Sequence, residues 1–406
     1  MNILDIITKK KNKEELTYDE LSYAFLGYLN KEIPDYQMSS LLMAITINGM
    51  TLNETINLTD IFINSGDKYE FTKPVCDKHS TGGIGDTVTF VIAPILGALN
   101  IPICKMSGRG LGITGGTIDK LESIPGYNIN LTKEEYYQSI DTCHIAVGAQ
   151  TANLVPLDKV IYALRDVTGT TESIPLIVSS IMSKKIACGA SYIVIDIKCG
   201  EGALIKTKKD AEILSKWLTK IGEHFNRKIK TIITDMDEPL STSIGNALEV
   251  EEAIEVLKGK ENNLQKVSIE VASQLIAMYK DIPLKEAEIE AKQTLKDNTA
   301  YNAFEKWINN QHGDLSKLKV SDKVLELKSS KDGIIKHISA LACGKLALKL
   351  GAGRLTKESQ IDYGVGIKIL VQKGDKVQKG QVLALLYVND KKPKLTNEDL
   401  QIFQIN

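Results

Sequence analysis

The chain has 406 residues, of which 43% are hydrophobic and 25% are charged, and its formal net charge is −1. A chain of this length is expected to form two or three domains, and this composition is typical of globular proteins. The near-zero net charge excludes a global electrostatic attraction to nucleic acid or anionic lipid, so any attraction for an anion must be local.

The six cysteines are dispersed, at positions 76, 104, 143, 188, 199 and 343. No CxxC pair and no zinc-type spacing of His and Cys occurs, so reduced and mostly buried thiols are expected. The N-terminal run MNILDIITKKK carries its charges after its apolar residues, which is the reverse of a signal peptide. The longest apolar run, Val88 to Leu99, is too short to span a bilayer. These features predict a cytoplasmic protein.

Residues 1–66 are predicted to be helical throughout. Apolar residues recur near helical spacing between Leu16 and Leu29, and Thr17 with Glu20 resembles a capping box. A further helix is expected through SSLLMAITING, and another from about residue 53 to residue 66. No strand-like alternation interrupts this segment, which indicates an all-helical domain.

From Lys73 the short apolar runs PVCDKH, IPICKMS, SYIVIDIK and KIKTIITDM alternate with glycine loops and helices. This alternation is typical of an α/β layer with a mixed, mainly parallel sheet. IVIDIK and TIITDM are apolar on both faces, which predicts strands covered by helices on both sides. Residues 157–189 interrupt the pattern with two helices, which we assign to the N-terminal helical domain.

From about Lys328 the sequence alternates with period two around Gly-Asp and Lys-Gly turns, with a helix expected near Cys343 to Leu350. This pattern predicts a small β-rich module of the α+β kind. The predicted fold class is therefore α/β, with three domains: a helical domain (1–66 plus 157–189), an α/β phosphate-binding domain (67–156 plus 190–327) and a C-terminal α+β domain (328–406).

The most informative motif is KHSTGGIGD, from Lys78 to Asp86. It follows a predicted strand and leads into an apolar helix, an arrangement that directs backbone N–H groups at an anion. The lysine and the small hydroxyls add charge and donors that a plain tight turn would not need. His79 is a plausible acid in this setting, because its charge changes near neutral pH.

A second glycine loop, KMSGRGLGITGGT, follows the next strand and runs from Lys105 to Thr117. It contains a GxGxxG match, but the dinucleotide-binding motif also needs an acidic residue at the end of the following strand. The nearest acids, Glu134 and Glu135, lie in TKEEYYQSI, which resembles a helix start. Lys105 and Arg109 also suit a free anion, so we favour inorganic phosphate over a dinucleotide.

Three polar residues of the second helical stretch are candidates for a binding face. Arg165 ends an amphipathic helix, and Ser180 and Lys184 lie four residues apart on the next one, which puts hydroxyl and ammonium on one face. From spacing alone a solvated face remains the alternative, and Lys185 is expected to be an example of such a solvated lysine.

With these residues identified, the chain resembles the thymidine phosphorylases and the closely similar pyrimidine-nucleoside phosphorylases. Four segments carry the resemblance, in the family's order: DKHSTGGIGDT, KMSGRGLGITGGTIDKLESIPG, YALRDVT and SIPLIVSSIMSKKIA. The resemblance implies a homodimer, which we expect to form through the helical domain. It also implies a pentosyltransferase that cleaves pyrimidine nucleosides, among them thymidine, deoxyuridine and uridine, with phosphate as co-substrate and no organic cofactor.

The resemblance also implies roles for residues of this sequence. Catalysis would involve His79, Arg165 and Lys184. The base would be held by Tyr162, Arg165, Ser180 and Lys184. Phosphate would be held by Lys78, Ser80, Thr89, Lys105, Ser107 and Thr117. Some members of the family bind a potassium-like cation, and the matching positions are Gly85, Thr87, Leu240, Ser243 and Glu252.

This sequence departs from the family pattern near the expected site. Ile113 stands where many members have His, and Cys199, Glu201 and Leu204 alter the usual DVKTGAGAF segment. The C-terminal segment is also shorter than expected from the family.

Two other functions are compatible with parts of the sequence. An anthranilate-type phosphoribosyltransferase shares the glycine loops, but it would need acidic ligands for a pyrophosphate-bound metal. A catalytically inactive, phosphorylase-like binding protein is the other alternative. Residues 365–388 resemble a lipoyl-type hairpin without its modified lysine.

Overall fold

The computed structural model describes residues 1–406 except positions 111, 114, 355, 357, 358, 391–393, 397 and 400. The chain divides into two compact units. The first comprises Met1–Asp77, Gln150–Ile193 and Glu212–Thr231, and the second comprises Lys78–Ala149, Val194–Ala211 and Ile232–Asn406. No helix among the described residues is both long and apolar enough to cross a membrane.

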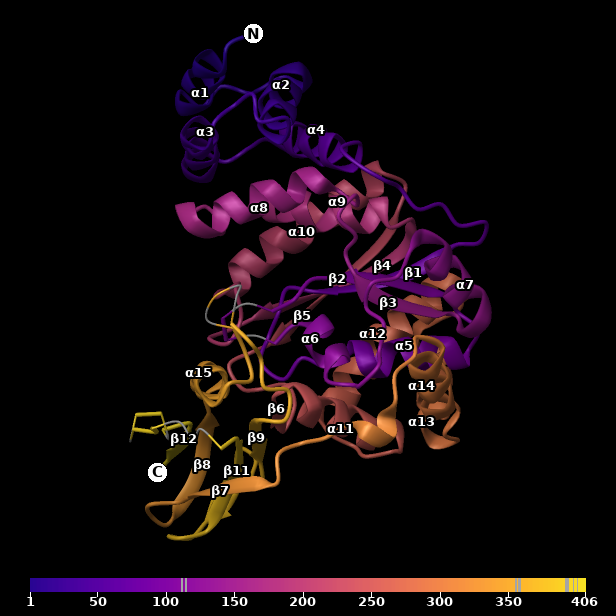
Figure 1. The fold of residues 1–406 in the computed structure, drawn as a ribbon, viewed down its shortest axis with the longest axis vertical. Helices are drawn as coiled ribbons and strands as arrows, with labels where there is room; N and C mark the ends of the chain where they lie inside the picture. The colour runs from indigo at the N-terminus through magenta and orange to yellow at the C-terminus, as the bar shows by residue number, and fades with distance from the viewer. Residues whose placement is uncertain are drawn as a thin grey trace. The chain divides into compact units, whose positions relative to one another are not determined.

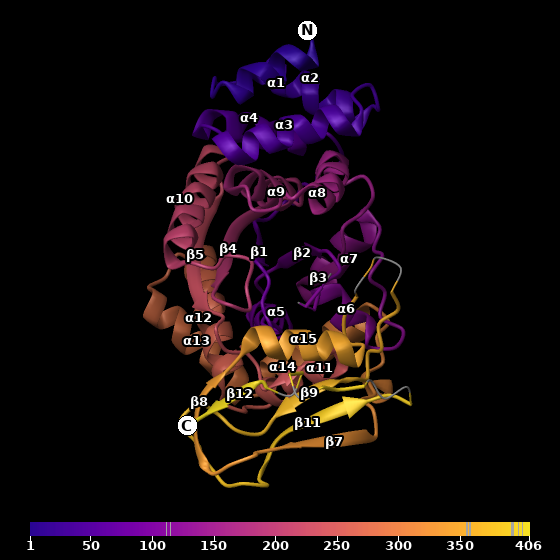
Figure 2. The ribbon, with the colours of Figure 1, turned by 90° about the vertical axis from the view of Figure 1, so that its left-hand side faces the viewer.

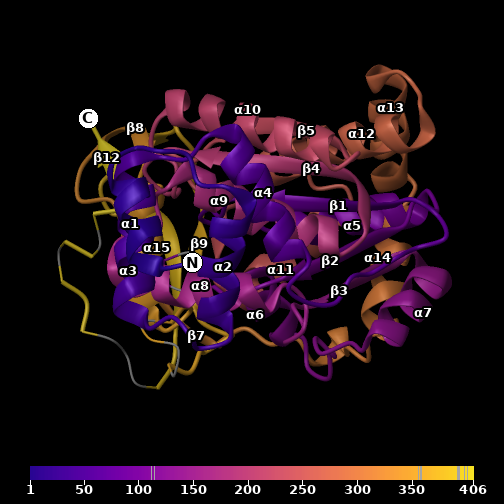
Figure 3. The same cartoon turned by 90° about the horizontal axis from the view of Figure 1, so that it is seen from above.

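The first unit contains the helices predicted for the N-terminal segment and for the second helical stretch. Their bounds are α1 (Ile3–Lys11), α2 (Tyr18–Leu29), α3 (Asp35–Asn48), α4 (Leu52–Ile63), α8 (Pro156–Thr168) and α9 (Ile174–Ala187). The capping box predicted at Thr17 and Glu20 is confirmed, and Thr51 and Glu54 form a second one at the start of α4. Helix α1 packs against α3 and α2 against α4 (Figure 3), while α9 packs against α4.

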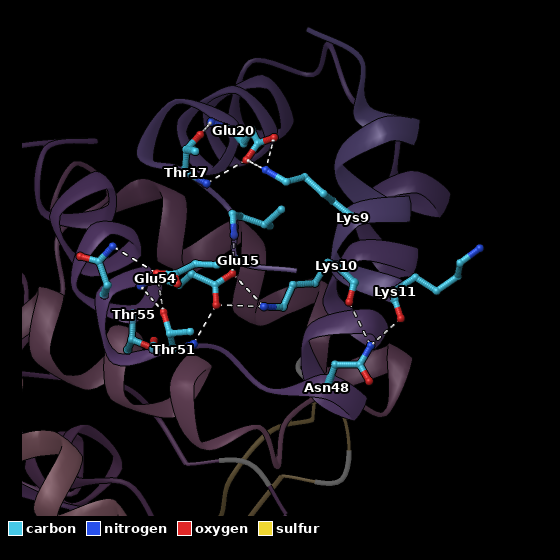
Figure 4. Close-up of polar contacts among 12 residues, drawn as sticks. Lys9, Lys10, Lys11, Glu15, Thr17, Glu20, Asn48, Thr51, Glu54 and Thr55 are labelled. Atoms are coloured by element: carbon cyan, nitrogen blue, oxygen red, sulfur yellow. Dashed lines mark hydrogen bonds and ion pairs between the residues drawn. The ribbon is translucent and has the colours of Figure 1, made fainter. Parts of the chain in front are cut away.

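Buried and half-buried ion pairs hold α1 against the starts of α2 and α4 (Figure 4). Lys10 Nζ lies 2.8 Å from a carboxylate oxygen of Glu54, and both side chains are almost completely buried. The Glu54 carboxylate also accepts N–H groups from Leu16 and Thr51. A buried charge with this many partners fixes the orientation of three neighbouring helices.

A five-stranded sheet has the strand order β3-β2-β1-β4-β5. Its strands are β1 (Val75–Ser80), β2 (Ile103–Ser107), β3 (Ile145–Ala149), β4 (Ala190–Cys199) and β5 (Lys228–Asp235). The β2–β3 pair is parallel, with Ile103 opposite Ile145. These strands alternate with helices, as the glycine-punctuated pattern predicted.

Helix α5 (Thr89–Ala98) lies against β2 and β3, and α12 (Asn263–Lys280) and α14 (Thr299–Asn310) pack against α5 (Figure 1). The other helices that alternate with these strands or follow them are α6 (Thr117–Glu122), α7 (Lys133–Cys143), α10 (Lys208–His224), α11 (Asn246–Leu257) and α13 (Leu284–Lys296). A 3-10 turn at Leu315–Lys317 comes after α14. Phe90, Phe304 and Trp307 are fully buried and stack edge to face or tilted, so aromatic packing joins α5 to α14.

The prediction that two strands are covered on both faces is confirmed for β4 and wrong for β5. Six consecutive residues of β4, from Ile193 to Lys198, are buried. In β5 only Ile229 is buried, and Ile233 is 40% exposed. The reason is position, because β5 is an edge strand, and an apolar composition alone does not distinguish an edge strand from a central one.

The C-terminal part of the chain forms small antiparallel sheets with one helix between its halves. Its elements are β6 (Ser243–Ile244), β7 (Lys323–Lys328), β8 (Gly333–Ile338), α15 (Ala340–Leu350), β9 (Gly366–Ile369), β10 (Lys376–Val377), β11 (Val382–Val388) and β12 (Phe403–Ile405). Strands β6, β9, β11 and β7 form one sheet, β10, β8 and β12 form another, and α15 packs against β9 (Figure 2). The predicted β-rich module and its helix are confirmed.

Candidate functional site

The predicted phosphate-binding residues lie on two neighbouring strands and on the helices that follow them. Lys78 and Ser80 are on β1, and Lys105 and Ser107 are on β2, the adjacent strand. Thr89 is the first residue of α5, and Thr117 is the first residue of α6. Lys105 donates from Nζ to the carbonyl oxygen of Lys78 over 2.8 Å, so the two strands place the two lysines side by side.

The first glycine loop closes on Asp86, the last residue of the KHSTGGIGD motif, for which the sequence suggested no role. Ser80 Oγ donates to Asp86, and Lys78 Nζ lies 3.7 Å from the same carboxylate. The backbone N–H of Gly82 donates to Ser80 Oγ over 3.3 Å. The loop thus turns back toward β1 and brings Lys78, Ser80 and Asp86 together.

Buried lysines lie close to these loops. We use the name lysine cluster for a set of buried charged residues in the second unit: Lys78, Asp86, Lys105, Lys120, Asp196, Lys198 and Glu249. Lys120 pairs with Glu249 over 3.0 Å, and Lys198 pairs with Asp196 over 2.6 Å. With four lysines and three carboxylates, the cluster has a net positive charge in a buried setting, which favours a bound anion.

The pKa shifts within the lysine cluster follow from burial and from charge. Burial lowers the pKa of Lys78, and the charges of Asp86 and Asp196 oppose that shift. Burial would raise the pKa of the Asp86 carboxyl, but the charges of Lys78 and Lys198 and the hydrogen bond from Ser80 hold that pKa well below its usual range. An anion that contacts Lys78 would replace the solvation that burial removes from the ammonium group.

His79 lies on β1 between Lys78 and Ser80 and is partly exposed. Successive side chains of a strand point to opposite faces, so His79 faces away from the two phosphate-loop residues on either side of it. This alternation lets one strand contribute to two different parts of a site.

The four predicted base-binding residues lie together in the first unit. Tyr162 and Arg165 are on α8, and Ser180 and Lys184 are on α9. Lys184 Nζ lies 3.1 Å from Ser180 Oγ, as the four-residue spacing predicted, and 6.0 Å from the centre of the Tyr162 ring. The Tyr162 side chain is 44% exposed, so this cluster reaches the surface of its unit.

The Arg165 guanidinium is held in place by backbone carbonyl oxygens. Its Nε donates to Thr170, its Nη1 to Leu176 and its Nη2 to Thr171, over 3.0, 3.3 and 2.9 Å. Burial lowers the pKa of Arg165, although nearby acidic groups oppose the shift. Arg165 is 1% exposed, and these three bonds fix the plane of its guanidinium.

Asp158 on α8 is a residue of this cluster that sequence analysis missed. Its Oδ2 lies 2.7 Å from Lys184 Nζ, and its side chain is almost fully buried. Its Oδ1 has no hydrogen-bond partner within the described part of the chain. The signal was available, because Asp158 stands seven residues before Arg165, on the same face of the helix.

The expectation that Lys185 lies on a solvated face is wrong. Lys185 is buried, and its Nζ lies 2.7 Å from Asp77 Oδ2. Adjacent lysines of α9 therefore have different environments: Lys184 belongs to the half-exposed cluster, and Lys185 belongs to a buried ion pair at β1.

The five positions matched to a cation site come from segments that the second unit brings together. The Ser241 hydroxyl donates to the carbonyl oxygen of Gly85, and the backbone N–H of Leu240 donates to Ile84 over 3.0 Å. Thr87 Oγ1 donates to Glu249 over 2.5 Å. The Glu252 carboxylate accepts N–H groups from Thr242, Ser243 and Asn262.

Glu252 is buried, and among the described residues it has no cationic partner. A buried carboxylate beside backbone and hydroxyl oxygens fits a hard cation. Clusters of three or more His, Cys, Asp or Glu side chains, as a transition metal would need, do not occur among the residues that the structure describes.

The residues that depart from the family pattern belong to the second unit: Ile113 lies in the second glycine loop, Cys199 ends β4, and Glu201 and Leu204 follow that strand. Glu201 accepts a hydrogen bond from Ser339 over 2.5 Å and lies 3.4 Å from His337. Leu204 is 46% exposed. Cys199, at the end of β4, is the one partly exposed cysteine; the other five are buried, and all six are free thiols, as expected.

The dinucleotide alternative is not supported by the position of its acidic residues. Glu134 and Glu135 lie in the first turn of α7, and Glu135 forms a capping box with Thr132. Neither acid is at the end of a strand, where the ribose of a dinucleotide would be bound.

Comparisons with known proteins match the chain along nearly its whole length. Residues 4–66 match the helical bundle domain of a glycosyl transferase family, and residues 72–301 match its a/b domain. Residues 334–401 match the pyrimidine nucleoside phosphorylase C-terminal domain.

Two bacterial relatives illustrate the similarity. The chain is 46% identical to a pyrimidine-nucleoside phosphorylase of Bacillus subtilis and 45% identical to that of Geobacillus stearothermophilus. Each alignment covers 96% of this chain and 92% of the relative. The anthranilate phosphoribosyltransferase of Thermus thermophilus has a similar fold, with a TM-score of 0.61 at 15% identity over 75% of this chain and 98% of that protein.

Proposed function

The chain belongs to the pyrimidine-nucleoside phosphorylase family, and we propose that it catalyses the reversible phosphorolysis of pyrimidine nucleosides. The proposed substrates are thymidine, deoxyuridine and uridine, and the products are the free base and a pentose 1-phosphate. As a pentosyltransferase of this kind, the protein would serve nucleoside salvage. The structural observation that carries the proposal is the excess of buried lysines at the two glycine loops, which favours a bound phosphate.

In this proposal, phosphate is a substrate and the nucleophile. The residues that would hold it lie in the two glycine loops and in the adjoining strands and helices: Lys78, Ser80, Thr89, Lys105, Ser107 and Thr117. A phosphate oxygen forms a bond to C1′ of the pentose as the bond from C1′ to N1 of the base breaks. The electron pair of the broken bond leaves with the base.

The residues proposed to bind the base act on that departing charge. The pentose becomes oxocarbenium-like as the bond stretches, and the base becomes negatively charged. Arg165 and Lys184 supply positive charge to the base, Ser180 supplies a hydroxyl, and Tyr162 lies alongside. Preorganised donors of this kind stabilise a transition state because they do not have to reorient during the reaction.

His79 is proposed to donate a proton or a hydrogen bond to the base carbonyl. The alternation of β1 supports this assignment, because His79 faces away from the phosphate loop while its neighbours, Lys78 and Ser80, face toward it. A positioned acid typically contributes about 10²–10⁴-fold to a rate.

We propose a monovalent, potassium-like cation at the segments that contain Gly85, Thr87, Leu240, Ser243 and Glu252. The buried Glu252 carboxylate, which has no cationic partner among the described residues, supports this site. The cation would offset that charge and hold the first glycine loop to the segment before α11. The assay below, run in potassium or in choline as the only monovalent cation, tests the site: equal rates and equal melting temperatures would contradict it.

A cytoplasmic location stays a prediction. We also propose a homodimer that forms through the helical domain. Helix α3 supports the dimer because its outer face exposes large apolar side chains at helical spacing. Tyr36 is 72% exposed, Met43 is 38% exposed and Ile47 is 74% exposed. An apolar stripe of this kind is uncommon on a face that stays in water.

Replacing Ile47 by glutamate is expected to dissociate the dimer, because a charge would have to be buried at the interface. Light scattering coupled to size-exclusion chromatography measures the mass of the particle directly. Lys31→Glu, an exposed change outside the stripe, serves as the control. A wild-type protein that elutes as a monomer would contradict the proposed dimer.

The proposed reaction predicts base release that depends on phosphate. The protein is incubated with thymidine, uridine or deoxyuridine, with and without phosphate, and the free base is measured. Base and pentose 1-phosphate should appear in equal amounts and only with phosphate. Turnover that instead requires a phosphoribosyl pyrophosphate and a divalent metal would favour the phosphoribosyltransferase alternative. No turnover under any condition would favour a binding protein.

A further inference from the structure

The C-terminal domain contacts both glycine loops within the second unit. A Cβ atom at Gly344 of α15 would lie 2.6 Å from Ile84 Cδ1 in the first loop and 3.1 Å from the carbonyl oxygen of Ile113 in the second. The backbone N–H of Gly112 donates to the carbonyl oxygen of Arg354 over 2.9 Å. The loops proposed to hold phosphate are therefore supported from a segment more than two hundred residues later in the sequence.

A buried ion pair lies at the centre of this contact. Arg354 Nη1 donates to Asp119 Oδ1 over 2.5 Å, and Arg354 is 8% exposed while Asp119 is 1% exposed. A more exposed arginine, Arg109, lies 3.9 Å from the same carboxylate and also pairs with Glu122. The Arg354 pair is the shorter and the more deeply buried of the two, so it carries more of the electrostatic attraction.

Asp119 also binds the backbone of the second glycine loop. Its Oδ2 accepts the backbone N–H groups of Gly110 and Gly116 over 2.7 and 3.2 Å. These two glycines lie between Ser107 and Thr117, two of the proposed phosphate-binding residues. The Asp119 carboxylate therefore holds the loop at Gly110 and at Gly116, the residue before Thr117.

Arginine suits this position better than lysine would. A guanidinium is planar and stays charged, and its fixed fork can keep a carboxylate in one orientation. A further contact of Arg354 Nη1, 3.5 Å from the carbonyl oxygen of Gly110, places the same group against the loop backbone. Loss of the guanidinium would leave the buried Asp119 carboxylate without its closest cation.

We propose that Arg354 is a positioning residue for phosphate: through Asp119 it fixes the second glycine loop in the shape that binds the anion. This inference rests on the proposed function, because it assumes that the loop binds phosphate. Arg354 itself does not need to touch the substrate. The C-terminal domain would thus control affinity for the nucleophile, and the pyrimidine-binding residues of α8 and α9 would be unaffected.

The test compares Arg354→Gln with Lys349→Gln. Lys349 belongs to the same domain and forms an ion pair with Asp399, and no contact of its side chain with a glycine loop is found among the described residues. Arg354→Gln is expected to raise the KM for phosphate roughly tenfold or more, while the KM for thymidine and the kcat at saturating phosphate change little. Lys349→Gln is expected to leave all three constants unchanged.

Two further measurements test whether the guanidinium of Arg354 is what phosphate binding needs. In Arg354→Ala, added guanidinium chloride should restore phosphate affinity, whereas sodium chloride at equal ionic strength should not. If Arg354→Gln fails to fold, Arg354→Lys, which retains the charge but not the fork, should still weaken phosphate binding. Wild-type phosphate affinity in a folded Arg354→Gln or Arg354→Lys variant would overturn the proposal.

The proposed reaction and the proposed role of Arg354 are tested by different measurements. Phosphate binding is followed by the rise in melting temperature that inorganic phosphate causes, which needs no turnover. Wild-type protein that shows this rise but releases no base would contradict the phosphorolysis. A rise that is lost in Arg354→Gln and kept in Lys349→Gln would still support the positioning role, and an equal rise in both variants would contradict it.

Discussion

Replacing Lys184 by methionine is expected to lower kcat about 10²–10³-fold, the range found when one preorganised donor to a developing negative charge is removed. Lys184 is suited to this role because its ammonium group is held, rather than free to move. Asp158 Oδ2 and Ser180 Oγ lie 2.7 and 3.1 Å from its Nζ, and the side chain remains 25% exposed. The lysine is thus fixed by its neighbours and still accessible to a ligand.

The measurement is steady-state base release with thymidine and phosphate, together with the melting temperature. Lys159→Met, an exposed lysine on α8, is the matched control and should keep wild-type rates. Asp158→Asn keeps the lysine and removes the carboxylate that orients it, so it separates the effect of the lysine's charge from the effect of its orientation. A folded Lys184→Met variant with a near-normal kcat would contradict the proposed role of the lysine.

Local features of the fold could be predicted from the sequence because they depend on neighbouring residues. The capping box at Thr17 needs only a glutamate three residues later, and the two glycine loops follow directly from the strands that precede them. Ser180 and Lys184 lie together because four residues make about one helical turn. Each of these predictions uses a local motif or spacing that tertiary packing did not override.

Features that depend on contacts between distant segments could not be predicted in this way. The environment of Lys185 is set by Asp77, which is 108 residues away, and Arg354 lies 235 residues from Asp119. The edge position of β5 likewise follows from strand order, which its own composition does not encode.

The sequence of β4 also marks residues of the candidate site. Asp196 and Lys198 interrupt the apolar run of β4, and charged residues inside a fully buried strand are rare unless they are paired or functional. The structure places both in the lysine cluster.

Replacing Lys78 by methionine is expected to raise the KM for phosphate roughly 10–150-fold, which corresponds to about 1.5–3 kcal/mol for a hydrogen bond to a charged group. Lys78 is 2% exposed and lies beside Lys105. Its loss would bring the lysine cluster from four lysines to three, equal to its three carboxylates, so the positive excess that favours an anion would disappear. Lys73→Met, an exposed change five residues earlier, is the control.

The same lysine predicts how phosphate affinity depends on pH. Burial lowers the pKa of Lys78, and the protonated ammonium group is the form that attracts phosphate. As pH rises through that lowered pKa, the charge is lost, so the KM for phosphate should increase at a lower pH than an ordinary lysine would allow. Lys78→Arg keeps its charge over this range, so its KM should stay flat where that of the wild type rises. Parallel pH profiles for wild type and Lys78→Arg would show that another group titrates and would contradict this pH prediction.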